Sequence, residues 1–455
     1  MGSSRLGVAD SNRRSFAVPI ACLLIALALL SSGALLEWAF FPAGTIVGTA
    51  RREVVLDSFR ILILAAGVYL LLRKPRITVV ELLATVVVSL IFGLAGAMLL
   101  QVAYVPPPVV SGWKSFVAAT EQNQLGFRGR QFDYKPNDYV ILLLGDSQVE
   151  ATALAFDAMP ERLLERYLGS ANIKVFSVGA GGYGQDQQLL ALQEYFATYR
   201  ANLVVLWQTP GNDVWNNVFR THMGNRNTKP TFWIDESGDL CGPTESLLQP
   251  LANSRVVVAS LWQLAFGLPW QDKRWERELP TPYVPLDQYT GTVRTEWQER
   301  WDTNLGRMRD ENLDTEKSHM AVLLTPRSKR MQYGLDLTRA LMQRIRELAS
   351  AKGAGLIILQ VDDHTITPEK DGVYVLNGKY YRVSNRQYLS NWDYVNTGFD
   401  VEVIPVTAKD WRVGPEDGHL NTQATDQVMS DLAERLRPKI RETNASKGVT
   451  GSGVH

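Results

Sequence analysis

Residues 139–150, YVILLLGDSQVE, are the stretch of this chain that most strongly indicates its fold. Residues 139–144 are largely apolar and show no alternation of polar and apolar positions, a pattern typical of a strand buried on both faces. Gly145 ends this strand, and Asp146 and Ser147 follow it. Because ligands of open α/β sheets collect at the carboxyl ends of the strands, Ser147 is a candidate nucleophile. The triplet alone is weak support, since Gly, Asp and Ser also favour turns.

The alternation of buried strands and helices continues along the chain. After the first strand, we predict a helix at 160–168, a strand at 173–177, a helix at 185–199, a strand at 203–207, a helix at 337–352, strands at 355–361 and 401–406, and a helix at 422–436. The first three strands end in loops of small or polar residues, as a sheet with a site along one edge requires. This order predicts an α/β fold with a three-layer, doubly wound parallel sheet, in a domain of residues 139–440.

Residues 214–330 do not fit this alternation and are expected to form an insertion in the sheet domain. They hold a large share of the chain's 12 tryptophans. These side chains either bury area against the sheet or form a cap whose indole rings stack on sugars, and we favour burial. Residues 106–138 are interpreted as a connector that begins with three prolines, and the polar, Gly/Ser-rich residues 441–455 as a disordered tail.

Three apolar stretches near the amino terminus, at about 16–36, 54–72 and 77–105, predict transmembrane helices that together form a membrane domain of residues 1–105. Basic residues precede the first stretch and separate the second from the third. By the positive-inside rule, the amino terminus is then cytoplasmic and the sheet domain lies on the other side of the membrane. A cleaved signal peptide is the alternative interpretation of the first stretch.

The charge balance and the cysteines exclude several classes of partner. The 47 Lys and Arg residues are balanced by 47 Asp and Glu residues, so no net charge indicates binding to nucleic acid. Cys22 and Cys241 lie in very different sequence surroundings, which argues against a structural disulfide, and no zinc-binding spacing is present. We expect neither a metal nor a cofactor.

A serine hydroxyl becomes a good nucleophile only when a base takes its proton, and the usual base is a histidine held by a carboxylate. Among the five histidines, His419 is the strongest candidate, because its segment PEDGHLN precedes the last predicted helix and can lie at the same sheet edge as Ser147. Glu416 and Asp417 lie three and two residues before it, and either could reach its ring. His364 is a weaker candidate beside two aspartates. The remaining histidines, His222, His319 and His455, are interpreted as surface or core residues.

An acyl-transfer site also needs donors directed at the developing oxyanion. The backbone N–H groups of Ser147 and of the glycine-rich run GAGGYG at 179–184 could supply two, and the Asn212 amide a third. The glycine-rich run could instead bind a phosphate. It lacks both the GxGxxG spacing and a Lys-Ser/Thr ending, so we disfavour nucleotide binding.

Four ordered blocks together resemble the SGNH (GDSL-type) hydrolase superfamily. They are GDS at 145–147, the glycine-rich turn after the second strand, GND at 211–213, and a carboxylate-x-His near the carboxyl end. The segments VFSVGAGGYGQDQQLLAL and LVVLWQTPGNDVWNN are especially similar to membrane-anchored bacterial members. The resemblance covers about residues 139–220 and 335–437 and implies a flavodoxin-like hydrolase fold.

The resemblance also implies roles for individual residues. Ser147 is the nucleophile, and its N–H forms the oxyanion hole with Gly182 and Asn212. His419 is the base. The usual spacing of the acid in the family would select Glu416, but an Asp-x-His spacing resembles that of some polysaccharide-modifying relatives, so Asp417 is the expected acid and Glu416 the alternative. Glu150 departs from the family, where a small residue is common, and puts the shape of the pocket in doubt.

The expected function is therefore that of a serine esterase or O-acyltransferase in a bacterial cytoplasmic membrane. Its substrates would be acetyl or acyl esters of envelope polysaccharide or lipid outside the cell, with a multi-span acyltransferase as a further partner. One alternative is a non-catalytic envelope protein that binds glycan or scaffolds an export complex on an inherited hydrolase fold. Another is a lipase or phospholipase.

Overall fold

The computed structural model describes residues 16–30, 50–73, 87, 118–220, 229–243, 275–303, 311–362, 370–407, 409–414 and 417–450. These residues belong to two compact units. One unit contains the described helices that precede residue 107, and the other contains the described residues from 118 onward.

Five parallel strands form the central sheet of the larger unit: β1 (Tyr139–Gly145), β2 (Ile173–Gly179), β3 (Leu203–Gln208), β7 (Gly355–Asp362) and β10 (Val401–Pro405). Their order is β10-β7-β3-β1-β2, and all neighbours are parallel. The chain passes from β1 to β2 on one side and then returns to place β3 on the other. This is the doubly wound order in which a ligand site forms where the winding reverses, here between β1 and β3.

The residues of β1 explain why its sequence shows no alternation. All seven are buried. Val140, Leu142 and Leu144 pack into the core on one face of the sheet. Ile141 and Leu143 pack into the core on the other face. A strand between two cores needs apolar residues at every position.

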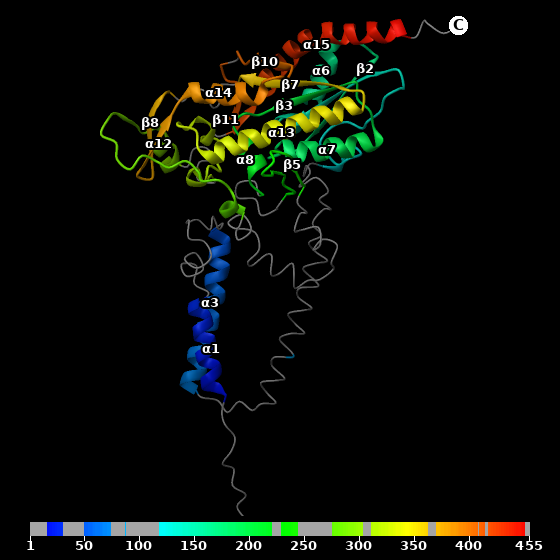
Figure 1. Cartoon of the computed structure of the whole chain (residues 1–455). Helices are drawn as coiled ribbons and strands as arrows, with labels where there is room; N and C mark the ends of the chain where they lie inside the picture. The colour runs from blue at the N-terminus through cyan, green and yellow to red at the C-terminus, as the bar shows by residue number, and fades with distance from the viewer. Residues whose placement is uncertain are drawn as a thin grey trace, which may run out of the picture. The chain divides into compact units, whose positions relative to one another are not determined.

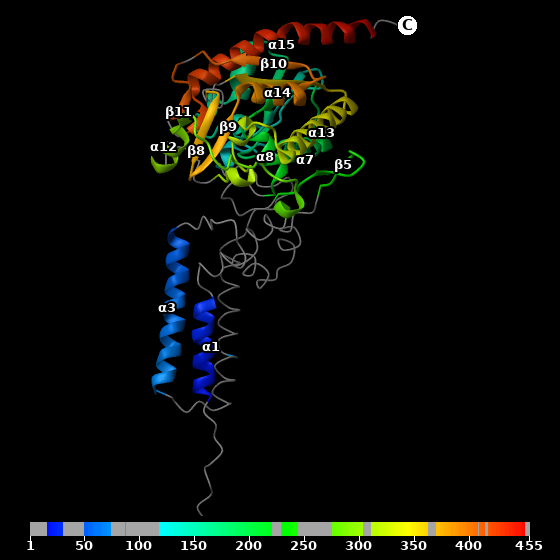
Figure 2. The same cartoon turned by 60° about the vertical axis from the view of Figure 1, so that its left-hand side comes forward.

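Helices cover both faces of the sheet. One core includes residues of α7 (Gln185–Thr198), α8 (Asp213–Val218) and α13 (Lys329–Ala351). The other includes residues of α6 (Pro160–Leu168) and α15 (Thr422–Thr450). In Figures 1 and 2, α13 (yellow) and α15 (red) lie on opposite sides of the strands. The predicted α/β class with a parallel sheet between helical layers is confirmed.

Shorter elements complete the larger unit. The short helices are η1 (Ala119–Glu121), α5 (Ser147–Glu150), η2 (Phe156–Ala158), α12 (Glu296–Thr303), η5 (Leu313–Thr315), η6 (Ala321–Leu323) and α14 (Asn385–Asn396). The short strands are β4 (Trp233–Ile234), β5 (Leu240–Cys241), β6 (Val293–Arg294), β8 (Gly372–Leu376), β9 (Lys379–Val383), β11 (Arg412–Gly414) and β12 (Asp417–Leu420). They form the small sheets β4-β5, β6-β8-β9 and β11-β12.

Residues 214–330, the expected insertion, include a strand that pairs with a later part of the sheet domain. Its strand β6 pairs with β8, which lies far along the chain. Trp215, Trp275 and Trp297 are buried. Trp262 and Trp270 lie outside the described residues, and Trp233 and Trp301 are only partly buried. For the three buried indoles, the structure agrees with the interpretation that they bury area.

Two other boundaries differ from the sequence expectation. Within the expected connector, Phe127 is fully buried in the core of the sheet domain. At the carboxyl end, α15 continues to Thr450, into the stretch expected as a tail. The sheet domain therefore uses described residues on both sides of the range predicted for it.

The prediction of a multi-pass membrane protein is wrong for the part of the chain that the structure describes. None of the described helices is long and apolar enough to cross a membrane. Helix α1 (Ala17–Leu30) has 14 residues, or about 21 Å at 1.5 Å per residue, against a hydrocarbon core of about 30 Å. Helix α3 (Ala50–Arg73) has 24 residues, but charged residues interrupt its first three turns. The third expected span, 77–105, lies outside the described residues except for Val87.

The close approach of β1 and β2 at their carboxyl ends yields a test of the fold. A Cβ at Gly179 would lie 2.8 Å from the Gly145 carbonyl oxygen and 3.1 Å from that of Asp146. We expect Gly179→Ala to lower the free energy of unfolding by about 1–3 kcal/mol, because backbone cannot move aside cheaply. Urea denaturation of the whole chain measures this change.

Gly355→Ala is the matched control in the same sheet. Its Cβ would meet only Leu203 Cδ1 at 3.4 Å and the Asn202 carbonyl oxygen at 3.9 Å, which are ordinary contacts. We expect it to leave stability unchanged or to raise it by about 0.5 kcal/mol. Equal decreases in the free energy of unfolding for Gly179→Ala and Gly355→Ala would contradict the close packing at Gly179.

Candidate active site

Ser147 begins a short helix at the end of the central strand. Asp146 is the N-cap of α5, and its Oδ1 accepts a hydrogen bond of 2.9 Å from the Gln148 N–H. A side chain at Gly145 would collide with Val149 Cγ2, because a Cβ there would lie 2.5 Å away. Glycine before the cap therefore lets the helix fold back closely on β1. Gly145 and Asp146 are buried, whereas Ser147 is partly exposed.

Asn212 meets this turn from the neighbouring strand. It is the N-cap of α8, after β3, and its Nδ2 donates a hydrogen bond of 3.0 Å to Asp146 Oδ2. Because β1 and β3 flank the point where the winding reverses, this contact lies where ligands bind in such sheets. The side-chain amide nitrogen of asparagine carries two hydrogens, so Asn212 can donate one to Asp146 and the other to an oxyanion.

His419 and Asp417 form a hydrogen-bonded pair on β12. Asp417 Oδ1 bonds His419 Nδ1 and also accepts the His419 backbone N–H at 3.0 Å. Alternate residues of a strand project from the same face, which is why an Asp-x-His spacing suits this pair. With Nδ1 occupied, Nε2 is the ring nitrogen that can exchange a proton with a serine. The alternative acid, Glu416, lies outside the described residues.

Strand β12 lies beside the helix that carries Ser147. The Leu420 N–H donates a hydrogen bond of 3.3 Å to Gln148 Oε1. Burial raises the pKa of Asp146, and a protonated His419 would oppose that rise, so the two side chains lie near each other. Among the described residues, no hydrogen bond joins Ser147 to His419. Such bonds are often long in a free enzyme and shorten when substrate binds.

The glycine-rich turn after β2 also reaches Ser147. A Cβ at Gly181 would lie 4.0 Å from Ser147 Cβ. The next residue, Gly182, has a φ of +77°, a conformation that favours glycine. The Gly181 N–H donates to Glu150 Oε2 at 2.7 Å. Glu150 therefore turns inward toward the turn, with 7% of its surface exposed.

Two buried carboxyls lie close together at this edge. Burial raises the pKa of Asp146, and its bonds to the Gln148 N–H and Asn212 oppose that shift. Burial also raises the pKa of Asp213 well above its usual value, and the charge of Asp146 raises it further. Removing a carboxylate from solvent is costly, and for Asp213 the nearby negative charge of Asp146 adds to that cost.

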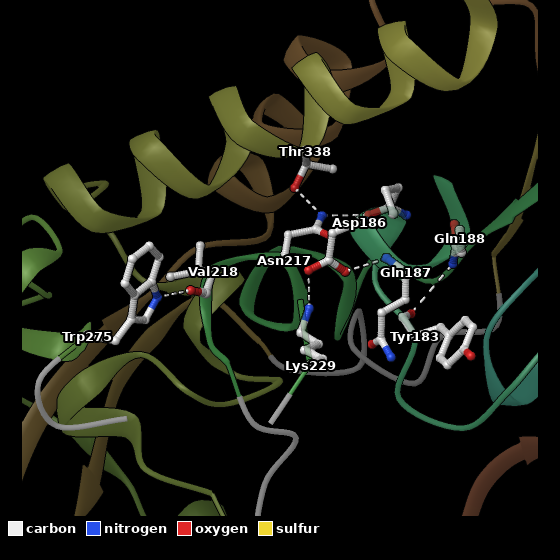
Figure 3. A network of polar contacts seen from close by, with 10 residues as sticks. Tyr183, Asp186, Gln187, Gln188, Asn217, Val218, Lys229, Trp275 and Thr338 are labelled. Atoms are coloured by element: carbon white, nitrogen blue, oxygen red, sulfur yellow. Dashed lines mark hydrogen bonds and ion pairs between the residues drawn. The ribbon is translucent and has the colours of Figure 1, made fainter. Parts of the chain in front are cut away.

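A buried polar network lies where α7, α8 and α13 meet (Figure 3). Asn217 Nδ2 donates to Gln185 Oε1 at 2.7 Å and to Thr338 Oγ1 of α13 at 2.9 Å. Asp186 forms an ion pair with Lys229, and both side chains are buried. The network therefore ties three helices together, and Asn212 is the N-cap of one of them, α8. Sequence reasoning missed it, although amides and acids gathered at the starts of two helices were a visible signal.

The described residues contain no cluster of His, Cys, Asp and Glu suited to a metal ion. A cavity of about 630 Å³ is lined by β6, α12 and β8, with Arg294 and Glu299 among its residues. None of its lining residues belongs to the group around Ser147. The candidate site is therefore defined by the arrangement of its side chains and is separate from this cavity.

Comparison with known proteins assigns no family. No protein-family model matches the chain, and no curated protein matches it. Among solved structures, it is similar to an acetyl xylan esterase from the rumen bacterium Butyrivibrio proteoclasticus, at 10% identity and a TM-score of 0.30, over 68% of this chain and 65% of that chain. It is also similar to a proposed arylesterase from Agrobacterium tumefaciens, at 13% identity and a TM-score of 0.29, over 66% and 99%. At TM-scores this low, neither likeness assigns a function to this chain.

The raised pKa of Asp213 predicts a pH-dependent effect on stability. The folded state favours the protonated carboxyl, so this residue costs stability as pH rises from its unfolded-state pKa through its folded-state pKa. We expect Asp213→Asn to raise the free energy of unfolding at pH 8 by about 1–3 kcal/mol, and the gain to shrink toward about pH 4. Urea denaturation at several pH values measures it.

Asp157→Asn is the control for this experiment, since 90% of the Asp157 side chain is exposed. It should change stability by less than about 1 kcal/mol at every pH. An Asp213→Asn protein that is less stable than wild type by the same margin at all pH values would show that burial does not shift the Asp213 pKa.

Proposed function

We propose that this chain is a serine esterase of the SGNH type, with Ser147, His419 and Asp417 as its catalytic residues. The observation that carries the proposal is the hydrogen-bonded Asp417 and His419 pair on β12, a strand bonded to the helix that Ser147 begins. A histidine oriented by a carboxylate beside a serine, at the switch point of a doubly wound sheet, suits nucleophilic catalysis.

In this mechanism, Ser147 Oγ attacks the carbonyl carbon of an ester while His419 Nε2 takes the hydroxyl proton. Asp417 accepts the Nδ1 hydrogen and stabilises the imidazolium that forms. The carbonyl reforms, the C–O bond to the alcohol breaks, and His419 gives its proton to the departing alcohol. Water then attacks the acyl-serine, His419 takes a proton from the water, and that proton returns to Ser147 as the acid leaves.

The tetrahedral intermediates carry a negative oxygen that needs donors. The N–H groups of Ser147 and Gly182 and the second hydrogen of Asn212 Nδ2 are the proposed oxyanion hole. Support comes from the bond between Asn212 and Asp146 and from the short separation between the glycine turn and Ser147. Donors held in place before the reaction stabilise the transition state more than donors that must reorient.

The proposed substrates are acetyl or other acyl esters of a carbohydrate or a lipid. The exposed fractions of the His419 and Asp417 side chains, 23% and 37%, leave the pair accessible to an ester carried on a large molecule. If a sugar hydroxyl replaces water in the second step, the same residues transfer the acyl group. A membrane acyltransferase partner would supply the acyl group in that case.

Substitution of the acid distinguishes the two carboxylates near His419. We expect Asp417→Asn to lower kcat for an acyl ester by about 10²–10⁴-fold, because the amide no longer holds the correct histidine tautomer. Glu416→Gln is the matched control and should keep the wild-type kcat. Ser147→Ala should remove turnover. Hydrolysis of p-nitrophenyl acetate and of acetylated sugars measures all three.

Three outcomes would contradict the proposal in whole or in part. A larger loss for Glu416→Gln than for Asp417→Asn would assign the acid to the other carboxylate. Wild-type turnover by Ser147→Ala would exclude the serine mechanism. A chain that hydrolyses no ester but binds acetylated glycan would support a non-catalytic binding protein.

A further inference from the structure

Glu150 is a buried acidic side chain that the proposed mechanism does not use. It is the last residue of α5 and lies three positions after Ser147. Residues at this spacing project from the same side of a helix. An acidic residue within one turn of the nucleophile, with 7% of its surface exposed, needs a specific partner to offset its loss of hydration.

That partner is the glycine-rich turn after β2. One residue of this turn, Gly182, supplies a proposed donor of the oxyanion hole. Glu150 Oε2 accepts the Gly181 N–H at 2.7 Å. The position of a Cβ on Gly181 lies 3.3 Å from the same oxygen and 4.0 Å from Ser147 Cβ. Glu150 and Ser147 therefore flank one glycine. Hydrogen bonds to a carboxylate are about twice as strong as those between neutral groups, so this one can hold a glycine-rich segment in place.

The held segment includes the proposed oxyanion donor. Gly182 adopts a φ of +77° directly after Gly181. Glycines have more conformational freedom than any other residue, and a turn made of several has little rigidity of its own. The bond to the Gly181 N–H fixes the peptide plane between Ala180 and Gly181. Only the two backbone torsions of Gly181 then separate this fixed plane from the Gly182 N–H, so the range of directions open to that N–H is reduced.

The backbone around Glu150 is also held in place by hydrogen bonds. Arg128 is 3% exposed, and its guanidinium donates to the carbonyl oxygens of Glu150, at 3.2 Å, and Leu154, at 2.8 Å. It also bonds the Ala151 carbonyl oxygen. The backbone of Glu150 is therefore anchored while its side chain reaches the turn. The contact connects the helix of the nucleophile to the segment that carries a donor.

We propose that Glu150 is a positioning residue of the oxyanion hole, which holds the Gly181 and Gly182 segment against Ser147 so that the Gly182 N–H is directed at the reacting carbonyl oxygen. This inference rests on the proposed esterase function.

The rate of phosphonylation by a fluorophosphonate tests this role. The serine oxygen displaces fluoride, and the phosphoryl oxygen takes the place of the oxyanion, so the rate depends on the donors. We expect Glu150→Ala to slow labelling of the full chain by about 10- to 100-fold. Glu150→Gln should stay close to wild type, because its amide oxygen accepts the same N–H. For p-nitrophenyl acetate, Glu150→Ala should lower kcat and leave KM nearly unchanged.

Glu161→Ala is the matched control. Glu161 is also a fully buried acid, and its Oε1 accepts the Arg130 N–H at 2.8 Å, but it lies on α6. It should lower the melting temperature without slowing the labelling of folded protein. If Glu150→Ala does not fold, Glu150→Met keeps the side-chain volume without an acceptor and should show the same slow labelling.

Labelling of Glu150→Ala or Glu150→Met at the wild-type rate would overturn the inference. Labelling of Glu150→Gln as slow as that of Glu150→Ala would also overturn it. Glutamine can still accept the Gly181 N–H, so this hydrogen bond would then not be what sets the labelling rate. A different result would overturn the proposed function itself. In that case the wild-type chain would remain unlabelled, or Ser147→Ala would be labelled as fast as wild type.

Discussion

The candidate site depends on one buried carboxyl, Asp146, at the point where the winding of the sheet reverses. Its two oxygens accept hydrogen bonds from the Gln148 N–H and the Asn212 side-chain amide. Asp146 thereby joins the start of α5 to the start of α8, two segments that are far apart in sequence. A buried carboxylate without such donors would be very costly, so the segments that supply them are held near it.

Glycines at the ends of two strands and a buried polar network allow these segments to lie close together. Glycines at the ends of β1 and β2 leave room for α5 to lie against the sheet, and any side chain at Gly145 or Gly179 would meet neighbouring atoms. The Asn217 amide joins α7, α8 and α13, and the ion pair of Asp186 with Lys229 joins α7 to the segment of Lys229. The site is therefore supported by backbone packing on one side and by a hydrogen-bonded network on the other.

The strands were the most predictable part of the fold, because burial on both faces leaves nearly unbroken apolar runs in β1 and β3 and a mainly apolar run in β2. The placement of Ser147, Gly182 and Asn212 at one edge followed from the rule that parallel strands end together. Strand β12 was not predicted, since its short DGHL segment has no strand pattern. The burial of Asp186 and Lys229 was not predicted either, because a charged side chain shows nothing of its partner. The first two predicted spans were wrong because α1 has only 14 residues and charged residues occupy the first three turns of α3, and hydropathy alone does not give these helix boundaries.

In the proposed mechanism, Ser147 forms a covalent acyl intermediate with the help of His419. Peptide mass spectrometry after brief incubation of the full chain with p-nitrophenyl acetate and an acid quench measures this intermediate directly. We expect an acetyl group on the peptide that contains Ser147, its accumulation when deacylation is slow, and its absence in Ser147→Ala. Ester cleavage with no acetyl group on that peptide, or with the acetyl group on another residue, would contradict it.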